Sequence, residues 1–410
     1  NPDRKSQQSF QFYLGKVMKL SKSFETSMVG SFPRPAPVRD VFTSNSKIAP
    51  IKISTPGQVE EISVDIIKGD TKNKKNEHDV LINHESNGIN EHLNSNYMDG
   101  LVKYAVLLQE IAGLDVVTDG EWRRQAYTHV IDDLCSGFTQ DPRPGIRFGL
   151  IVTEPISAKS PGLLANDAKF LVNNSNRLTK ISVPSPYILG ARLWDPDYST
   201  KAYPTREKFI DDLVPILNYE LQQLVKSGID IIQIDEPDMA VLLDPAKEPI
   251  YGDREYDLKL GSTKINEMIH GIDGARTAMH MCRWNSLNRG WHWEGGYEPI
   301  IETLKSINVN QFFMEFSIPV AGSVSILKEL PEDKLIGLGC LDPRSELIPT
   351  AEDIVKRVEE ALKYVSPDRI GLNPDCGFAP DIRHNIPLDE CYAKLVNQVK
   401  AAKILESKHS

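Results

Sequence analysis

The chain has 410 residues, of which 40% are apolar and 25% are charged, a composition typical of soluble globular proteins. Its formal net charge of −10 disfavours non-specific binding to nucleic acid or to anionic membranes, because both need clustered Lys and Arg. No apolar run approaches the roughly 18 residues of a membrane-spanning helix, so we expect neither a nucleic-acid partner nor a membrane.

The first 24 residues carry little apolar pattern and are predicted to be an N-terminal extension. We place a catalytic domain at residues 25–405, interrupted by a polar insertion at about residues 43–96, where Asn and Lys are frequent. Within the insertion we expect a short hairpin at residues 51–53, a second apolar stretch at residues 64–67 and a mobile tip.

Outside the insertion, short apolar runs alternate with amphipathic helical stretches. The predicted strands cover residues 26–31, 115–119, 180–189, 230–235, 276–281, 311–316, 335–340 and 369–373. The predicted helices cover residues 98–112, 206–227, 263–271, 297–306, 324–330, 351–364 and 388–405. This alternation favours an α/β protein with a parallel sheet, and eight strands are the number that closes a (β/α)8 TIM barrel. The alternative, an open doubly wound sheet, would need a glycine-rich phosphate loop after the first strand, which is absent here.

Polar residues gather at the ends of the predicted strands. They are Ser31, Asp119, Glu121, Asp235, Glu236, His280, Cys282, Glu315, Asp342, Arg344, Asp375 and Cys376. Inward-facing barrel positions are otherwise filled by branched apolar side chains, and barrel enzymes collect their chemistry at the carboxyl ends of the strands. We therefore expect the active site at this face.

The spacing of His280 and Cys282 places both side chains on the same face of a strand. Glu315 ends the next predicted strand, and Cys376 follows the last one, which adjoins the first in a closed barrel. Zinc accepts nitrogen, thiolate sulfur and carboxylate oxygen, whereas thiolates disfavour magnesium and calcium. These four residues are the predicted zinc ligands. The alternative is a neutral, hydrogen-bonded His280 and two buried cysteines that never meet.

A ligand set with two thiolates and one carboxylate indicates chemistry on a thiol. It sets three negative charges against Zn²⁺, so a further bound sulfur would remain electron-rich, and coordination to a metal deprotonates a thiol. Sites of three His, or of two His and one Glu, are better suited to activating water. We predict that His280, Cys282 and Cys376 support alkyl transfer to a thiol, in particular methyl transfer, rather than hydrolysis.

At these positions the sequence resembles the cobalamin-independent methionine synthase family, within the uroporphyrinogen decarboxylase-like barrel superfamily. The similar stretches are Met28-Val29-Gly30-Ser31-Phe32-Pro33-Arg34, Ile234-Asp235-Glu236-Pro237, His280-Met281-Cys282, Met314-Glu315-Phe316-Ser317, Gly337-Leu338-Gly339 and Asn373-Pro374-Asp375-Cys376-Gly377. The resemblance implies a (β/α)8 barrel, the same four zinc ligands, and homocysteine as the thiol.

The resemblance also implies how the amino acid is held. Ser31 is similar to the family's contact to the substrate carboxylate, and Glu121 and Asp235 to its contacts with the ammonium group, which needs acceptors. Two other interpretations stay open. Residues 235–237 could form a strand-end turn that caps a helix. Glu121 could belong to a surface ion-pair cluster with Arg123 and Arg124.

Two features depart from the family pattern. Full-length members carry two barrels, whereas this chain has length for one and matches the C-terminal, catalytic one. In the folate-dependent members a His that can protonate the leaving group follows the Gly-rich stretch. Here Arg344 takes that place, and Arg is a poor general acid. The methyl donor is therefore open between methyl-folate and a corrinoid protein.

Three other functions fit parts of the pattern. A zinc-dependent transfer from an epoxide to a thiol would use the same ligands, but its sulfonate acceptor would conflict with Glu121 and Asp235. A metal-free decarboxylase-like barrel would leave His280 and the two cysteines unexplained. A catalytically silent binding barrel is the third.

The cysteines bear on the compartment. There are five, an odd number at wide spacing, unlike the dense disulfide framework of a small secreted domain. The polar first 20 residues lack a secretory apolar region. We expect a reducing, cytoplasmic location.

Overall fold

The computed structural model describes residues 19–43, 53–55, 58–62, 86–142, 149–244, 246, 253–286, 288–380, 383–384 and 386–409. Most of the predicted N-terminal extension and the apolar stretch at residues 64–67 lie outside these ranges. Within the predicted insertion, β1 (Ile53–Thr55) pairs with β2 (Gln58–Ile62) in an antiparallel manner, next to the hairpin expected at residues 51–53. The helix α3 (Ser86–Ala112) already begins inside the range given to the insertion.

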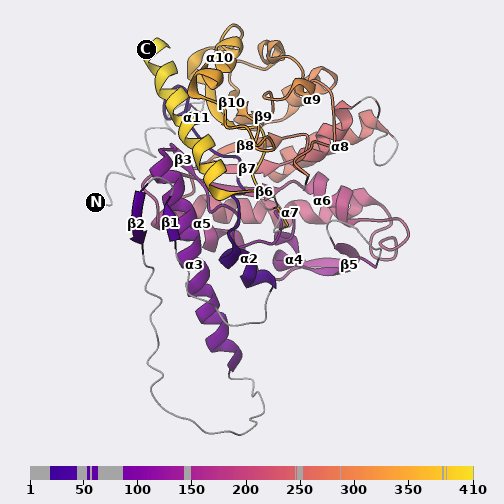
Figure 1. Ribbon diagram of the computed structural model, residues 1–410. Coiled ribbons are helices and arrows are strands. Elements are labelled where there is room, and N and C mark those ends of the chain that lie inside the picture. Colours follow the sequence, from indigo (N-terminus) through magenta and orange to yellow (C-terminus); the bar gives the residue numbers. More distant parts are fainter. Residues whose placement is uncertain are drawn as a thin grey trace, which may run out of the picture.

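A curled parallel sheet of seven strands forms the centre of the molecule, in the order β11-β10-β9-β8-β7-β6-β3 (Figure 1). The strands are β3 (Val116–Val117), β6 (Leu178–Pro184), β7 (Ile231–Asp235), β8 (Arg276–Met281), β9 (Gln311–Met314), β10 (Leu335–Leu341) and β11 (Ile370–Pro374). Nearly all of their residues are buried, because helices cover the outer face and side chains fill the inner one. The predicted α/β class with a parallel sheet is confirmed.

Residues 24–27 lie between the two edge strands of this sheet. The Phe24 and Ser27 N–H groups donate to the carbonyls of Ile370 and Leu372 in β11, at 2.8 and 3.0 Å. On the other side, the Thr26 carbonyl accepts the Val116 N–H of β3 at 3.0 Å. The first segment thus joins the two edges of the sheet.

The first predicted strand, residues 26–31, is not a regular strand. It makes one isolated bridge, from Thr26 to Leu372, so seven of the eight predicted strands are present as such in the described residues. Beyond Ser27 the backbone bonds to loops instead, since Phe32 donates to Gly120 and the Ser31 carbonyl accepts from Phe378. The segment therefore leaves the sheet at the face where the polar strand ends gather.

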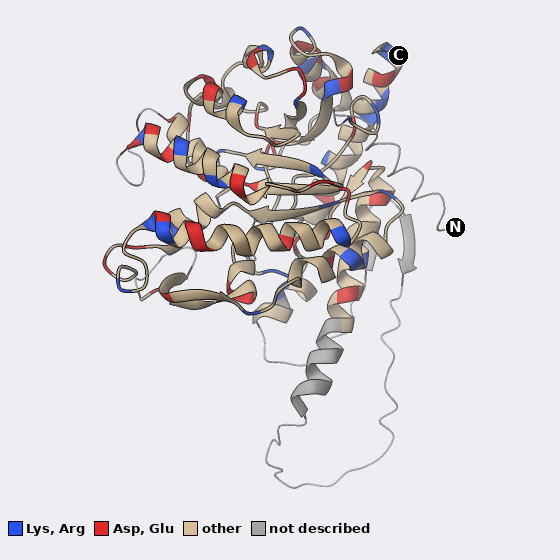
Figure 2. Ribbon diagram, turned by 180° about the vertical axis from the view of Figure 1, so that it is seen from behind, with Lys and Arg blue, Asp and Glu red and all other residues tan. Residues whose placement is uncertain are grey.

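Helices surround the sheet (Figure 1). Besides α3 they are α2 (Ala36–Thr43), α4 (Val130–Leu134), α5 (Leu163–Asn173), α6 (Pro186–Leu193), α7 (Arg206–Lys226), α8 (Arg254–Met268), α9 (Ile301–Ser306), α10 (Ala351–Ala361) and α11 (Leu388–His409). Short 3-10 helices are η1 (Pro237–Leu243), η2 (Glu298–Ile300), η3 (Pro319–Ala321), η4 (Val324–Glu329) and η5 (Pro367–Arg369). Figure 2 shows acidic and basic residues interspersed along the described helices. None of these helices combines the length and apolarity that crossing a membrane requires.

Several boundaries differ from the sequence prediction for local reasons. The strand expected at residues 180–189 ends at Pro184, because Ser185 caps α6 and Pro186 occupies its first turn. The helix expected at residues 263–271 begins at Arg254, after the cap Asp253. The helix expected at residues 324–330 is the 3-10 helix η4. The sequence pattern did not reveal α5 or the antiparallel pair of β4 (Cys135–Gln140) and β5 (Leu150–Ala158).

A buried ion pair fastens the first segment to the sheet. Arg276 Nη2 lies 2.5 Å from Glu25 Oε1, and the two side chains are 7% and 3% exposed. The second oxygen of Glu25 accepts the Ser21 N–H at 2.9 Å. Both charged residues lie at the amino ends of their segments, whereas the candidate site lies at the carboxyl ends of the strands. We therefore expect this ion pair to stabilise the fold and to take no part in the chemistry.

Replacing Glu25 with Ala would leave the Arg276 cation buried without its partner. We expect the free energy of unfolding to fall by about 3 kcal/mol or more, since breaking a buried pair costs roughly 3–5 kcal/mol. Chemical denaturation followed by tryptophan fluorescence measures this. The double variant Glu25→Gln with Arg276→Met should recover much of the loss. A change below about 1 kcal/mol, as for a surface pair, would contradict the assignment.

Candidate active site

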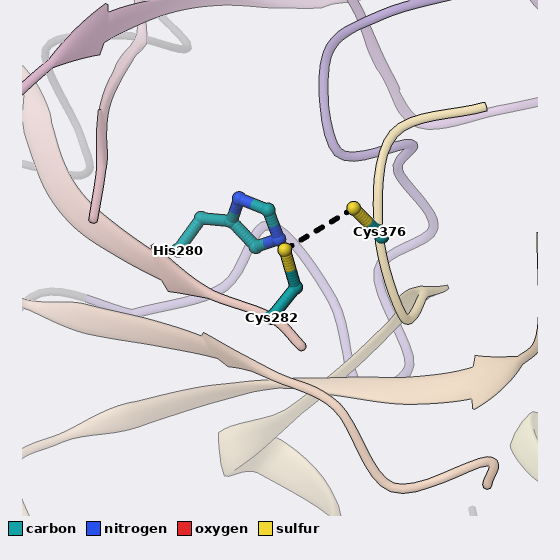
Figure 3. Close-up of side chains that lie close together, drawn as sticks. All are labelled: His280, Cys282 and Cys376. Carbon is teal, nitrogen blue, oxygen red and sulfur yellow. Dashed lines mark hydrogen bonds between the residues drawn. The ribbon is translucent and has the colours of Figure 1, made fainter. Parts of the chain in front are cut away.

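The structure brings His280, Cys282 and Cys376 together at the carboxyl end of the sheet (Figure 3). His280 lies in β8, Cys282 directly follows that strand, and Cys376 follows β11. Their ligand atoms all lie within 4.8 Å of one another, and the three residues are 3% to 5% exposed. The alternative in which the two cysteines never meet is therefore excluded.

The two sulfur atoms are joined by a hydrogen bond. Cys376 Sγ donates to Cys282 Sγ at 3.2 Å, which lowers the pKa of Cys282 well below its ordinary value and raises that of Cys376. Burial alone would lower the pKa of His280, but the Cys282 thiolate and Asp235 raise it to about 10. A divalent cation would displace the protons held here, because metal binding requires deprotonated ligands.

The donor atoms suit a metal such as zinc. His280 Nδ1 faces Asp235 Oδ1 at 3.2 Å, so Nε2, which is buried and makes no hydrogen bond within the described residues, is available as a ligand. Two thiolates on a tetrahedral zinc, each at about 2.3 Å, lie roughly 3.8 Å apart. The present sulfur–sulfur distance of 3.2 Å would need to widen only modestly.

Glu315 lies outside this group. It is fully buried, its Oε1 accepts a hydrogen bond from Arg344 Nη2, and its Oε2 accepts the Arg283 N–H at 2.5 Å. Three of the four predicted ligands therefore lie together. Both carboxylate oxygens of the fourth, Glu315, accept hydrogen bonds from other protein groups.

A chain of buried polar groups stands behind Asp235. Lys180 Nζ donates to the Met28 carbonyl at 2.6 Å and to Gln233 Oε1 at 2.7 Å. With its oxygen engaged by Lys180, Gln233 turns its amide nitrogen towards Asp235 Oδ1, at 2.7 Å. The same oxygen faces His280, so this chain fixes both the carboxylate and the imidazole.

Neither Lys180 nor Gln233 was among the site residues predicted from the sequence. The available signal was a long polar side chain inside an otherwise apolar strand, at residues 180 and 233. Burial lowers the pKa of Lys180 to about 7. The sequence pattern alone does not show whether a polar residue at position 180 or 233 is buried inside the sheet or exposed at the edge of a strand.

Glu121 is buried at the mouth of the sheet, 4% exposed, so the surface ion-pair interpretation is wrong. Its Oε1 accepts from Ser182 Oγ at 2.9 Å, while Arg123 pairs with Asp99 and Asp167 instead. Burial, followed by repulsion from Asp235, raises the pKa of Glu121 to about 7.

The backbone around Glu121 is unusual. Its own φ is 59°, a left-handed conformation that is costly for a residue with a side chain and is frequent at functional sites. A Cβ added at Gly30 would lie 2.5 Å from Glu121 Oε1, so only glycine permits this approach. Gly30 in the first segment thus leaves room for the Glu121 carboxylate.

Residues 235–237 combine two roles. Glu236 Oε1 accepts the N–H groups of Asp238 and Met239 at 3.0 and 3.1 Å and so caps η1. The capping interpretation therefore holds for Glu236, while Asp235 faces the cavity.

One pocket connects these groups. Its volume is about 430 Å³, including space open to solvent. Six predicted site residues line it, namely Ser31, Glu121, Asp235, His280, Cys282 and Cys376. It is also lined by Tyr127, Trp284 and Asn285, which the sequence analysis did not identify. Trp284 has a φ of 74°, a second left-handed residue at this site. The pocket combines two carboxylates with a cluster of two thiols and an imidazole, a combination suited to a small zwitterion that carries sulfur.

Comparison with known proteins identifies the family that this chain is similar to. The family model described as the catalytic domain of cobalamin-independent synthase matches residues 200–404. The methionine synthase of Pyrococcus horikoshii is 30% identical over 303 residues, which cover 72% of this chain and 79% of that protein. The methionine synthase of Pyrococcus abyssi is 29% identical over 302 residues, with the same coverage of 72% and 79%.

Solved structures share the fold. The B12-independent methionine synthase from Shewanella sp. W3-18-1, in complex with selenomethionine, has a TM-score of 0.68 at 22% identity and covers 94% of this chain and 98% of its own. A putative vitamin-B12-independent methionine synthase from Listeria monocytogenes has a TM-score of 0.64 at 22% identity, covering 94% and 99%. The family model and the relative at 30% identity together show that this chain belongs to the cobalamin-independent methionine synthase family.

Proposed function

We propose that this protein is a zinc-dependent methyltransferase that methylates the thiol of homocysteine to give methionine. The observation that carries the proposal is one pocket in which His280, Cys282 and Cys376 stand beside the carboxylates Glu121 and Asp235. Family membership supports methyl transfer to a thiol.

His280, Cys282 and Cys376 would hold the zinc, and Glu315 is the fourth proposed ligand once its carboxylate is released from Arg344. When bound, zinc lowers the pKa of a coordinated thiol and keeps it as a nucleophilic thiolate. Two cysteine sulfurs in the set argue against magnesium or calcium.

The remaining pocket residues bind and orient the amino acid. Asp235 Oδ1 is engaged by Gln233, so we assign the ammonium group to Oδ2 and to the Glu121 carboxylate. We assign the substrate carboxylate to Ser31, in the loop that also packs against residues 377–379. Fixing both ends of the amino acid would point its sulfur at the metal ligands and prepare it for in-line attack on the methyl carbon.

Arg344 supports a choice between the two candidate methyl donors. Its guanidinium stays protonated and is bound to Glu315 and Asp342, so it is not a proton source for a leaving group. This favours a corrinoid protein over methyl-folate as the donor. Transfer from an epoxide to a sulfonate-bearing thiol, the rival within zinc chemistry, is disfavoured because two carboxylates line the pocket.

We also propose a cytoplasmic location, because all five cysteines are unpaired and buried, as expected in a reducing compartment.

The donor can be identified directly. We expect the zinc-loaded protein, incubated with homocysteine, to form methionine from a methylated corrinoid, whereas methyl-folate and a sulfonium compound should give little. Mass spectrometry of the product measures this, with protein lacking zinc as the control. The proposed function would be contradicted if none of the three donors gave methionine.

Replacing Cys376 with Ser removes one thiolate from the metal group. We expect zinc content after dialysis against a chelator to fall far below that of the wild type and methyl transfer to be lost, while the circular dichroism spectrum is kept. Cys391→Ser, a buried cysteine in α11, is the matched control and should retain zinc. Wild-type zinc content and rate in Cys376→Ser would exclude this residue as a ligand.

The affinity for the amino acid should depend on pH through Glu121. Its pKa is raised to about 7, so the carboxylate is increasingly protonated below pH 7 and loses its attraction for the ammonium group. We therefore expect methionine, which has no thiol to titrate, to bind more weakly as pH falls from about 8 to about 6. Isothermal titration calorimetry measures this.

Glu121→Gln is the matched control. At pH 8 it should bind methionine about tenfold to a hundredfold more weakly, the range expected for losing a charged hydrogen bond. Its affinity should no longer change between the two pH values. An unaltered pH dependence in this variant would show that another group is responsible.

A further inference from the structure

Two aromatic side chains line the pocket together with Cys282, apart from the residues assigned to the amino acid. They are Tyr127 and Trp284, which are 9% and 6% exposed. Pro237, which begins η1 two residues after Asp235, lines the pocket with them. These three side chains all carry rings, and we call the surface that they form the ring wall.

Trp284 is held both at its backbone and at its ring. Its N–H donates a hydrogen bond to the Cys282 sulfur, and its carbonyl accepts one from Arg344 Nη1 at 2.8 Å. The Arg192 guanidinium lies 5.3 Å from the centre of the Trp284 ring. The His292 ring lies perpendicular to it, with 6.0 Å between the ring centres. The indole can therefore turn away from the pocket only by losing these contacts.

Arg192 is itself fixed by a buried acid. Its Nε donates to Asp238 Oδ2 at 2.6 Å and its Nη2 to Asp238 Oδ1 at 2.5 Å, while the Asp238 side chain is 0% exposed. Two parallel hydrogen bonds of this kind fix the plane of a guanidinium. Asp238 directly follows Pro237 in η1, so this ion pair connects two members of the ring wall.

Tyr127 reaches the pocket from the loop between β3 and α4. Burial, followed by repulsion from Asp238, raises the pKa of Tyr127 well above its ordinary value, so its hydroxyl stays neutral. Arg192, Asp235 and Cys282 also act on this pKa, which indicates that the ring lies between η1 and the metal group. The ring wall thus presents an uncharged surface with few rotatable bonds.

We propose that the ring wall limits the transferred alkyl group to methyl, which makes Tyr127 and Trp284 specificity-determining residues. This inference rests on the proposed function, which directs the substrate sulfur to the metal ligands. An alkyl group on that sulfur must share the pocket with rings that are held in place by their neighbours. One methylene more or less in an apolar pocket changes affinity about tenfold or more. The wall would also exclude the larger group that transfer from an epoxide leaves on sulfur.

The affinities of S-alkyl homocysteines, measured by isothermal titration calorimetry, test this inference. The zinc-loaded wild type should bind methionine about tenfold or more tightly than its S-ethyl homologue. In Trp284→Gly this ratio should fall below about threefold, because the space beside the sulfur is opened. Glycine suits the position, since the φ of Trp284 is 74°, so we expect the variant to fold.

The matched control is Trp291→Ala, which removes an indole that is 39% exposed in the same loop. It should keep the wild-type ratio.

Substitutions of Tyr127 separate a steric role from a polar one. Tyr127→Ala should lower the ratio as Trp284→Gly does, whereas Tyr127→Phe, which keeps the ring, should retain it. A lowered ratio in Tyr127→Phe would assign the effect to the hydroxyl and contradict a steric wall. If Trp284→Gly does not fold, the two Tyr127 variants still decide.

Two failures are distinguishable. Equal affinity of the wild type for the two homologues, or a wild-type ratio in both Trp284→Gly and Tyr127→Ala, would overturn the ring wall alone. A wild type that binds neither methionine nor homocysteine would overturn the ring wall together with the proposed function.

Discussion

The closure of the sheet by residues 24–27 is the constraint on which the site depends. This segment hydrogen-bonds to β11 on one side and to β3 on the other. It therefore brings together the loop that carries Ser31, the turn that carries Glu121 and the strand end that carries Cys376. Because β8 lies within the same curled sheet, its His280 and Cys282 reach the sulfur of Cys376 across the mouth. An open sheet would leave these groups on separate edges.

Buried charge is the second organising feature of the pocket. Carboxylates, an imidazole and two sulfurs are enclosed with little exposure to water, where unpaired charge is costly. Cationic side chains stand behind them, with Lys180 reaching Asp235 through Gln233, and Arg344 bound to Glu315. The protein thus fixes Asp235 and Glu315 from the inside, and this orients Asp235 for a substrate.

Arg344 bears on the methyl donor and not on the activation of the thiol. The groups that would activate a thiol are retained in this chain, and they stand together. At the place where a His would protonate a folate leaving group, the chain has an arginine that serves as an anchor between β10 and the metal group. On the proposed function, a donor whose leaving group needs no proton would match this site.

The sequence by itself determined the parallel α/β class, because apolar runs alternate with amphipathic stretches along the chain. It also determined that His280 and Cys282 share a face, because residues two apart in a strand point to the same side. It also indicated six of the pocket residues through polar strand ends and family resemblance. Only the tertiary structure decided which distant groups meet, since local periodicity carries no distances between elements. It placed Cys376 against Cys282, turned Glu315 to Arg344, and buried Lys180 behind Gln233. It also reduced residues 26–31 to one bridge, because their backbone is used by loops at the mouth.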